Sequence, residues 1–191
     1  MATMVVDSSS APSPEIDTFI DNQIKEWHFY VYFRPSNPAE QQAAMQLRDV
    51  IMKLVRAGAF VAVPLYRVHM EARGPHPVGS YEIWVPNETF AAVYGWLVMN
   101  KGNLSILVLP LTNQPKLDYA ERKAWLGEPW PLDLAMVPDS TGEDSFPKSQ
   151  YPKLSLGYNA DDGLTRNERR NMGTRVAKIL ENEVMAAKPT W

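Results

Sequence analysis

Residues 27–33 read WHFYVYF, and this stretch decides the fold because it is dense in aromatic and β-branched residues, which favour a β-strand. Side chains alternate between the two faces of a strand. The odd positions are expected to pack against helices: Trp27, Phe29, Val31 and Phe33. The even positions are expected to line an open face, where a ligand cavity fits: His28, Tyr30 and Tyr32.

Working outward from this strand, hydrophobic periodicity predicts two helices and three further strands. The helices are expected over 38–57 and 88–100, and the strands over 60–68, 80–85 and 104–109. The order β-α-β-β-α-β predicts an α+β, ferredoxin-like antiparallel sheet with both helices on one face. Parity on the last strand places Leu109 on the open face together with Ser105 and Leu107.

The rest of the chain divides by composition. A flexible arm is expected over 1–22, the α+β domain over 23–137, a linker over 138–164 and a final helix over 165–187. A capping-box pattern from Thr165 to Glu168 marks the start of that helix. Prolines after Pro110 predict ordered coil rather than regular structure, because proline removes a backbone donor. This proline-rich extension, or a partner subunit, is expected to cover the open face.

Bulk properties limit the partners. The net charge of −3 over 191 residues supplies no basic excess for a nucleic acid. No apolar run approaches the length of a transmembrane helix, about 18 residues or more, so no membrane partner is expected. The first residues lack the pattern of a secretory signal, and the expected location is cytoplasmic. With no cysteine in the chain, thiolate chemistry and disulfides are excluded.

Four segments carry a resemblance to a known family. They are WHFYVYF at 27–33, GPHP at 74–77, NLSILV at 103–108, and WLG at 125–127 followed by PLDL at 131–134. In order and spacing they resemble the DOPA 4,5-dioxygenase family, small enzymes that open catechol rings with non-haem iron. The resemblance implies histidines at three positions where this chain has Tyr30, Leu109 and Tyr119, so this chain is expected to be a divergent member.

The candidate site follows from these positions. The candidate catalytic residues are His28, His76, Tyr30 and Tyr119, because imidazole is the usual general base and tyrosine can hold a phenolate or enolate oxygen. The candidate substrate-binding residues are Tyr32, Arg67, Arg73, Glu82, Leu109 and Trp125. His76 sits in a stretch stiffened by two prolines, while His69 is expected at the surface. Solvated charge for the arginines and plain packing for the aromatic residues remain open alternatives.

A metal site is not the first expectation. Iron of this type needs about three protein ligands, and Leu109 cannot bind a metal. Any iron would depend on His28 and His76, with Glu82 or Asp118 as further candidates.

Three functions compete. The first expectation is a metal-independent isomerase, cyclase or lyase without a cofactor, acting on an aromatic, phenolic or polyketide-like molecule in natural-product biosynthesis. The alternative is a non-haem Fe2+ extradiol dioxygenase of catechols. The second alternative is a non-catalytic binding or assembly subunit whose open sheet face is an interface. A homodimer is expected, because ferredoxin-like sheets often pair.

Overall fold

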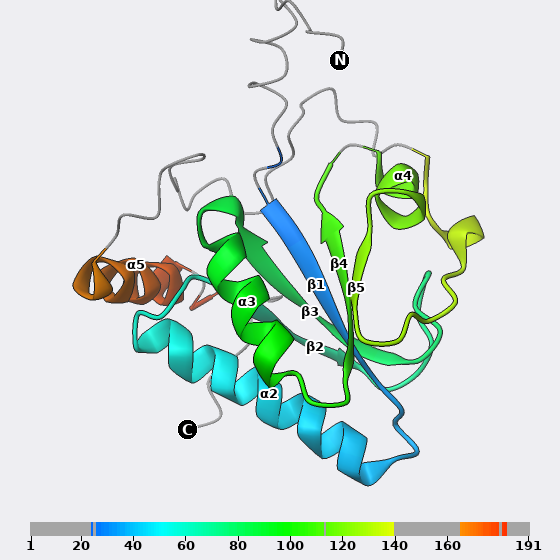
Figure 1. Ribbon diagram of the computed structural model, residues 1–191, viewed down its shortest axis with the longest axis horizontal. Coiled ribbons are helices and arrows are strands. Elements are labelled where there is room, and N and C mark those ends of the chain that lie inside the picture. Colours follow the sequence, from blue (N-terminus) through cyan, green and yellow to red (C-terminus); the bar gives the residue numbers. More distant parts are fainter. Residues whose placement is uncertain (1–23, 25, 113, 140–164, 180, 183–191) are drawn as a thin grey trace, which may run out of the picture.

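A five-stranded antiparallel sheet forms the centre of the protein (Figure 1). The computed structural model describes residues 24, 26–112, 114–139, 165–179, 181 and 182. The strands are β1 Glu26–Phe33, β2 Val63–His69, β3 Gly79–Pro86, β4 Ser105–Pro110 and β5 Ala124–Leu126. Their order is β2-β3-β1-β4-β5. The first four strands follow the ferredoxin-like order, so the predicted fold is confirmed, and β5 extends the sheet beside β4.

Two helices cover one face of this sheet (Figure 1). They are α2 Pro38–Arg56 and α3 Phe90–Asn100, and a single 3-10 turn, η1 Asn87–Thr89, leads into α3. The side chain of Asn37 caps α2 by accepting a hydrogen bond from the Glu40 N–H at 3.3 Å. Pro38 stands in the first turn of α2, where its missing N–H would have no partner inside the helix.

The main core lies between the helices and the sheet. Phe29, Val31 and Phe33 are fully buried there, as the alternation on β1 predicts. The facing helix residues Ile51 and Leu97 are also fully buried. Burying a large aliphatic or aromatic side chain contributes about 1.5–3 kcal/mol. This core therefore fixes the register of β1, because a slip of one residue would turn its polar face inward.

The opposite face of the sheet is covered by the segment that follows β4. That segment contains α4 Pro115–Ala120, β5 and the 3-10 turn η2 Leu134–Met136. The prediction of coil throughout this segment is wrong for α4 and β5, although the segment does cover the open face. Pro115 begins α4 instead of preventing it, because proline is tolerated in a helix's first turn.

Other expected boundaries moved by small amounts. The second strand begins at Val63 rather than residue 60, and a 3-10 turn replaces the expected helix start at 88. The capping box is confirmed: Thr165 N and Oγ1 each lie 2.7 Å from Glu168 Oε2 at the start of α5, Arg166–Ile179. The arm 1–22, most of the linker 138–164 and residues 183–187 of the last helix lie outside the described residues.

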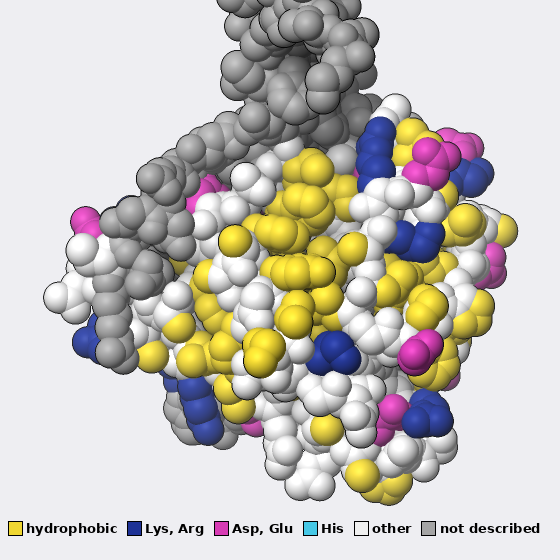
Figure 2. Space-filling view, in the orientation of Figure 1, with side chains coloured by type: hydrophobic (Ala, Val, Ile, Leu, Met, Phe, Trp, Pro, Cys, Tyr) yellow, Lys and Arg dark blue, Asp and Glu magenta, His cyan; other side chains and the backbone are white. Residues whose placement is uncertain are grey.

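Helix α3 is apolar on its outer side as well. It contains no charged residue, and Val98 and Met99 are 45% and 81% exposed. Apolar side chains gather on the face seen in Figure 2. No helix in the described part of the chain combines the length and apolarity that a membrane span requires.

Candidate active site

The candidate site lies on the sheet face opposite α2 and α3. The even-numbered residues of β1 project there, and the strand register places Glu82 opposite Tyr30 and Ser80 opposite Tyr32. On the other side of β1, Leu109 pairs with His28 and Leu107 pairs with Tyr30. Leu107 and Leu109 join Tyr32 in a second buried cluster, separate from the main core. The predicted alternation therefore brings His28, Tyr30, Tyr32 and Leu109 to one face.

Glu82 is the centre of the first group of contacts. Its Oε2 accepts a hydrogen bond from the Tyr30 hydroxyl at 2.8 Å. Its Oε1 lies 3.4 Å from His28 Nε2 and accepts no hydrogen bond of normal geometry among the described residues. The Tyr30 hydroxyl is also 3.4 Å from His28 Nδ1. An imidazole, a carboxylate and a phenol are thus held together at the middle of β1 and β3.

His76 is the centre of the second group. It is 8% exposed, and its Nδ1 lies 2.6 Å from the Tyr32 hydroxyl. Its Nε2 lies 3.4 Å from the hydroxyl of Tyr119 on α4. A neutral imidazole has one donor and one acceptor nitrogen, so the two tyrosines must play opposite roles toward it.

The loop that carries His76 is fixed by backbone contacts. The backbone of His76 pairs with Arg73 through two hydrogen bonds of 2.9 and 3.1 Å. Gly74 has φ +55°, a conformation that side chains disfavour, which allows the tight turn between them. The Asp133 N–H donates to the Pro75 carbonyl at 3.1 Å, so the segment after β5 holds the loop over the sheet.

Tyr30 connects the two groups. Its ring lies 4.3 Å from the His76 ring and 5.9 Å from the His28 ring, measured between centroids. The Tyr119 ring is 6.3 Å away. Position 30 therefore lies between the two histidines and separates the His28–Glu82 contact from His76.

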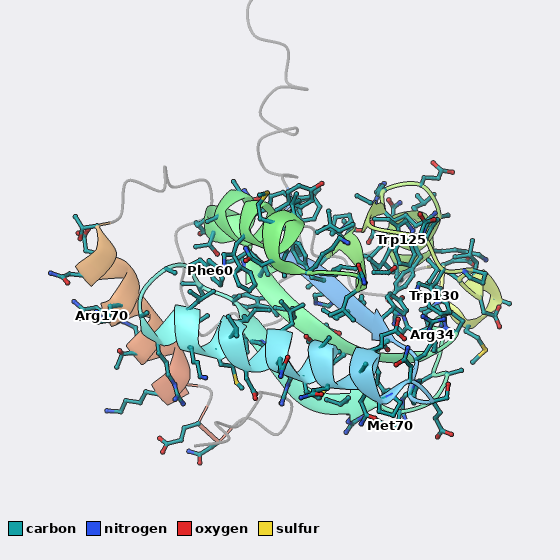
Figure 3. All side chains as sticks on the ribbon, turned by 60° about the horizontal axis from the view of Figure 1, so that its bottom comes forward. Arg34, Phe60, Met70, Trp125, Trp130 and Arg170 are labelled. Carbon is teal, nitrogen blue, oxygen red and sulfur yellow. The ribbon has the colours of Figure 1, made fainter. Side chains whose placement is uncertain are left out.

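Aromatic rings form the wall beside Tyr32. The ring centroids of Trp125 and Trp130 lie 5.4 and 6.4 Å from that of Tyr32, and the Trp130 ring is nearly parallel to it. Both tryptophans pack against the second buried cluster and come from the segment that follows α4, where Figure 3 labels them. Such surfaces favour flat aromatic ligands through ring stacking and burial of apolar area.

Burial sets the protonation states. It lowers the pKa of His76 to about 4, with the charges of His69 and His28 acting in the same direction. It raises the pKa values of Tyr30, Tyr32 and Tyr119 above the ordinary tyrosine value. At neutral pH the site therefore contains an uncharged imidazole, which has one nitrogen that accepts and one that donates a hydrogen bond, and phenols able to donate hydrogen bonds.

A family model for the Dopa 4,5-dioxygenase family matches residues 27–136, more than half of the chain. The chain belongs to this family. A DOPA 4,5-dioxygenase of Amanita muscaria is 50% identical over 181 residues, which is 94% of this chain and 78% of that protein. An uncharacterized 21.2 kDa protein of Botryotinia fuckeliana is 35% identical over 117 residues, covering 56% of this chain and 61% of that protein.

A solved structure supports the same placement. It is a crystal structure from Nostoc punctiforme of a protein provisionally assigned as a dioxygenase, with a TM-score of 0.51 and 32% identity. The match covers 59% of this chain and 90% of that one. The chain therefore has both the fold and the sequence of this dioxygenase family.

These matches correct the first functional expectation. The prediction of a metal-independent isomerase, cyclase or lyase is wrong, because a relative with half of its residues identical is named DOPA 4,5-dioxygenase. They favour the dioxygenase alternative. The expectation failed because it inferred a change of reaction from three side chains, whereas the chain matches a DOPA 4,5-dioxygenase at half of the residues over nearly its whole length.

The other residues predicted for the site lie outside the two groups of contacts around Glu82 and His76. Arg67 and Arg73 are both exposed, and the backbone of Arg73 pairs with that of His76. Asp118 is buried, and its oxygens accept hydrogen bonds from Thr112 and Arg122, so it supports α4.

Two residues of the site, Trp130 and Ser80, are not among those predicted from the sequence. Parity with Glu82 would have found Ser80, but nothing in the sequence places Trp130 beside Tyr32.

The residues present do not fit a three-ligand iron centre. Non-haem iron in such enzymes is held by imidazole and carboxylate groups that converge on one point and leave positions open. Among the residues that the structure describes, no group of three or more His, Cys, Asp or Glu side chains could hold a metal ion. His28 and Glu82 lie together, whereas both ring nitrogens of His76 face tyrosine hydroxyls.

Proposed function

We propose that this protein opens the ring of a catechol by dioxygenation, the activity for which its Amanita muscaria relative is named. The observation that carries the proposal is the 50% identity over 94% of the chain. The family match over residues 27–136 includes every segment that builds the site. In this reaction one ring carbon–carbon bond breaks and both atoms of O2 enter the product. The ring supplies all the electrons that O2 takes up, so no further reductant is required.

The aromatic wall is the part of the site that would bind the ring. Tyr32, Trp125 and Trp130 offer faces at stacking distances. Leu107 and Leu109 close the floor with apolar side chains that are no more than 2% exposed. A pocket with apolar walls and a few polar groups at one side orients a flat phenol by its hydroxyls.

The polar groups would handle the catechol protons. A catechol reacts with oxygen more readily after it loses a proton, so a base must lie at hydrogen-bond distance from its hydroxyl. Glu82 Oε1 is buried and accepts no hydrogen bond of normal geometry among the described residues, which leaves it able to accept one from a ligand. His28, 3.4 Å away, would share the proton, and the Tyr30 hydroxyl would hold the carboxylate in place.

Oxygen uptake tests the proposal. Protein purified without oxygen would be mixed with L-DOPA, with and without added Fe2+, and followed by an oxygen electrode and mass spectrometry of the product. We expect uptake together with a ring-opened product in at least one of the two conditions. Binding of catechols with no oxygen uptake in either condition would overturn the proposal and leave a catechol-binding protein in its place.

A pair of carboxylate variants tests the assigned base. Glu82→Gln keeps the shape of the side chain and removes its negative charge, so ring opening should fall by a factor of about 100 or more, the typical contribution of a positioned base. Glu88→Gln is the matched control, because Glu88 lies in η1, outside the site. Equal losses in the two variants would show that Glu82 has no special role.

A further inference from the structure

A short hydrogen bond joins two buried residues, Tyr32 and His76. They are 1% and 8% exposed, and the Tyr32 hydroxyl lies 2.6 Å from His76 Nδ1. An O–H donor makes shorter hydrogen bonds than an N–H donor, so this distance fits a phenol that donates to the unprotonated nitrogen of a neutral imidazole. The Tyr32 proton is therefore in direct contact with a base.

The other nitrogen of His76 allows the ring to hold that proton for a short time. When Nδ1 is the acceptor, Nε2 carries the proton of the neutral ring, and Nε2 lies 3.4 Å from the Tyr119 hydroxyl. After a proton transfer from Tyr32, each N–H of His76 would still have a phenol oxygen near it. Burial lowers the pKa of His76 to about 4, so the proton returns once the Tyr32 oxygen can hold it again.

Aromatic rings lead from Tyr32 toward solvent. Its ring centroid lies 5.4 Å from that of Trp125 and 6.4 Å from that of Trp130, and both tryptophans are partly exposed (Figure 3). The chain contains no cysteine, so tyrosine and tryptophan are its most easily oxidised side chains. Because electron transfer falls steeply with distance, rings this close offer the shortest path for an electron between the buried phenol and the surface.

Two other phenols show what sets Tyr32 apart. Tyr81 is also 1% exposed, but its hydroxyl donates at 2.9 Å to the carbonyl of Ala44, which is too weak a base to take the proton. The Tyr30 hydroxyl donates to the Glu82 carboxylate at 2.8 Å, but no tryptophan ring contacts the Tyr30 ring among the described residues. Of these three phenols, Tyr32 has both a base and neighbouring tryptophans.

We propose that Tyr32 and His76 form a redox-active pair that passes an oxidising equivalent from the site to Trp125 and Trp130. An oxygen-centred radical, the class of oxidant that partly reduced O2 gives, takes one electron from Tyr32 and becomes an anion that water protonates. The phenolic proton moves to His76 Nδ1. One electron then passes from a tryptophan to the Tyr32 radical, and the proton returns to the phenol oxygen. A reductant in solution, such as ascorbate, restores the tryptophan with one electron.

This role goes beyond the proposed function and does not depend on it. It protects the side chains of a site that handles O2, because the oxidising equivalent leaves the site before it damages them. The pair can be tested without a catechol and without O2, since an oxidant supplied from outside enters by the same rings in the opposite direction.

Flash photolysis of the full chain tests the pair. A laser pulse on ruthenium tris(bipyridine), with a sacrificial electron acceptor, forms Ru(III) as a one-electron oxidant in solution. Transient absorption and electron paramagnetic resonance distinguish tryptophanyl from tyrosyl radicals. We expect tryptophanyl radicals to form first and to decay into a tyrosyl radical. This second step should be slower in D2O, because the proton moves together with the electron.

Variants separate this tyrosyl signal from those of other tyrosines. Tyr32→Phe should lose the isotope-sensitive tyrosyl signal and prolong the tryptophanyl signal. His76→Gln keeps the phenol but removes its base, so it should lose the same signal. Tyr81→Phe is the matched control for a buried phenol and should keep it.

Two results would overturn the pair. The first is an isotope-sensitive tyrosyl signal of unchanged size in Tyr32→Phe, and a signal that disappears in Tyr30→Phe instead would assign the oxidation to Tyr30. The second is equal rates of tyrosyl formation in H2O and D2O in the unmodified protein, a result that does not depend on how any variant folds.

Discussion

At position 30 a tyrosine stands between an imidazole and a carboxylate. Its hydroxyl is 2.8 Å from Glu82 Oε2 and 3.4 Å from His28 Nδ1, and its ring centroid lies 4.3 Å from that of His76. A side chain at position 30 shares a strand face with His28, because residues two apart on a strand project to the same side. The identity of this one residue therefore determines how many metal-binding side chains meet at the centre of the site.

Tyr30→His should convert this centre into a metal site. The variant would place two imidazoles and the Glu82 carboxylate on one face, the donor set that divalent iron and zinc accept. We expect affinity for Zn2+ and Fe2+ to rise tenfold or more, which corresponds to about 1.4 kcal/mol. Equilibrium dialysis with elemental analysis measures the change.

The control for this prediction is Tyr30→Phe, which removes the hydroxyl but adds no ligand. Its metal affinity should stay at or below that of the unmodified protein. If the histidine variant bound no more metal than the phenylalanine variant, the geometry assigned to His28 and Glu82 would be incorrect.

At the scale of elements, the sequence predicts the faces well and the long-range pairings poorly. The alternation in WHFYVYF assigns the core and site faces of β1 correctly, because burial enforces it. The pairing of Tyr30 with Glu82, 52 residues apart, depends on strand order and register, which local patterns do not contain. Helix α4 was not predicted because the prolines of the segment after β4 suggested coil, yet α4 places the Tyr119 hydroxyl beside His76.

The support of α4 can be tested at Asp118. This buried carboxylate accepts hydrogen bonds from Thr112 Oγ1 at 2.6 Å and from Arg122 at 3.1 Å. Asp118→Ala leaves these donors without an acceptor, so we expect a loss of about 2–3 kcal/mol in the free energy of unfolding. Hydrogen exchange of the amides from 112 to 122 should also become faster.

Asp139→Ala is the comparison for Asp118→Ala. Asp139 pairs with Lys116 at 2.7 Å, but its side chain is 84% exposed, and such pairs contribute little. In the Asp139→Ala variant the free energy of unfolding should change by less than about 0.5 kcal/mol. A larger loss at Asp139 than at Asp118 would contradict the role given to the buried carboxylate.

At the scale of the whole molecule, two buried groups give opposite pH dependences of stability. The pKa of His76 is lowered to about 4, so the unfolded chain binds more protons between that value and 6.5. The contribution of His76 to the free energy of unfolding is therefore fully present above pH 6.5. It is lost as pH falls toward 4, by about 3 kcal/mol at most. Burial raises the pKa of Glu88 to about 7, so stability associated with Glu88 falls as pH rises from 4.5 to 7.

Single variants should separate these two effects. The Glu88→Gln variant keeps only the titration of His76 out of these two groups, so its free energy of unfolding should drop clearly as pH falls from 6.5 to 4.5. The His76→Gln variant keeps only the titration of Glu88 out of these two groups, so its free energy of unfolding should decline as pH rises through the same range. Urea unfolding at several pH values measures both slopes. Identical slopes in the two variants would show that neither group titrates as its burial requires.

The whole molecule combines a dioxygenase family sequence with a site in which, among the described residues, no three metal-binding side chains meet. The reaction that it catalyses is the decisive property. Turnover of L-DOPA under 18O2, followed by mass spectrometry, tests the central claim most directly. Ring opening by dioxygenation predicts a product that carries both labelled atoms and has lost the aromatic ring. A product without label, or an intact ring oxidised only to a quinone, would contradict it.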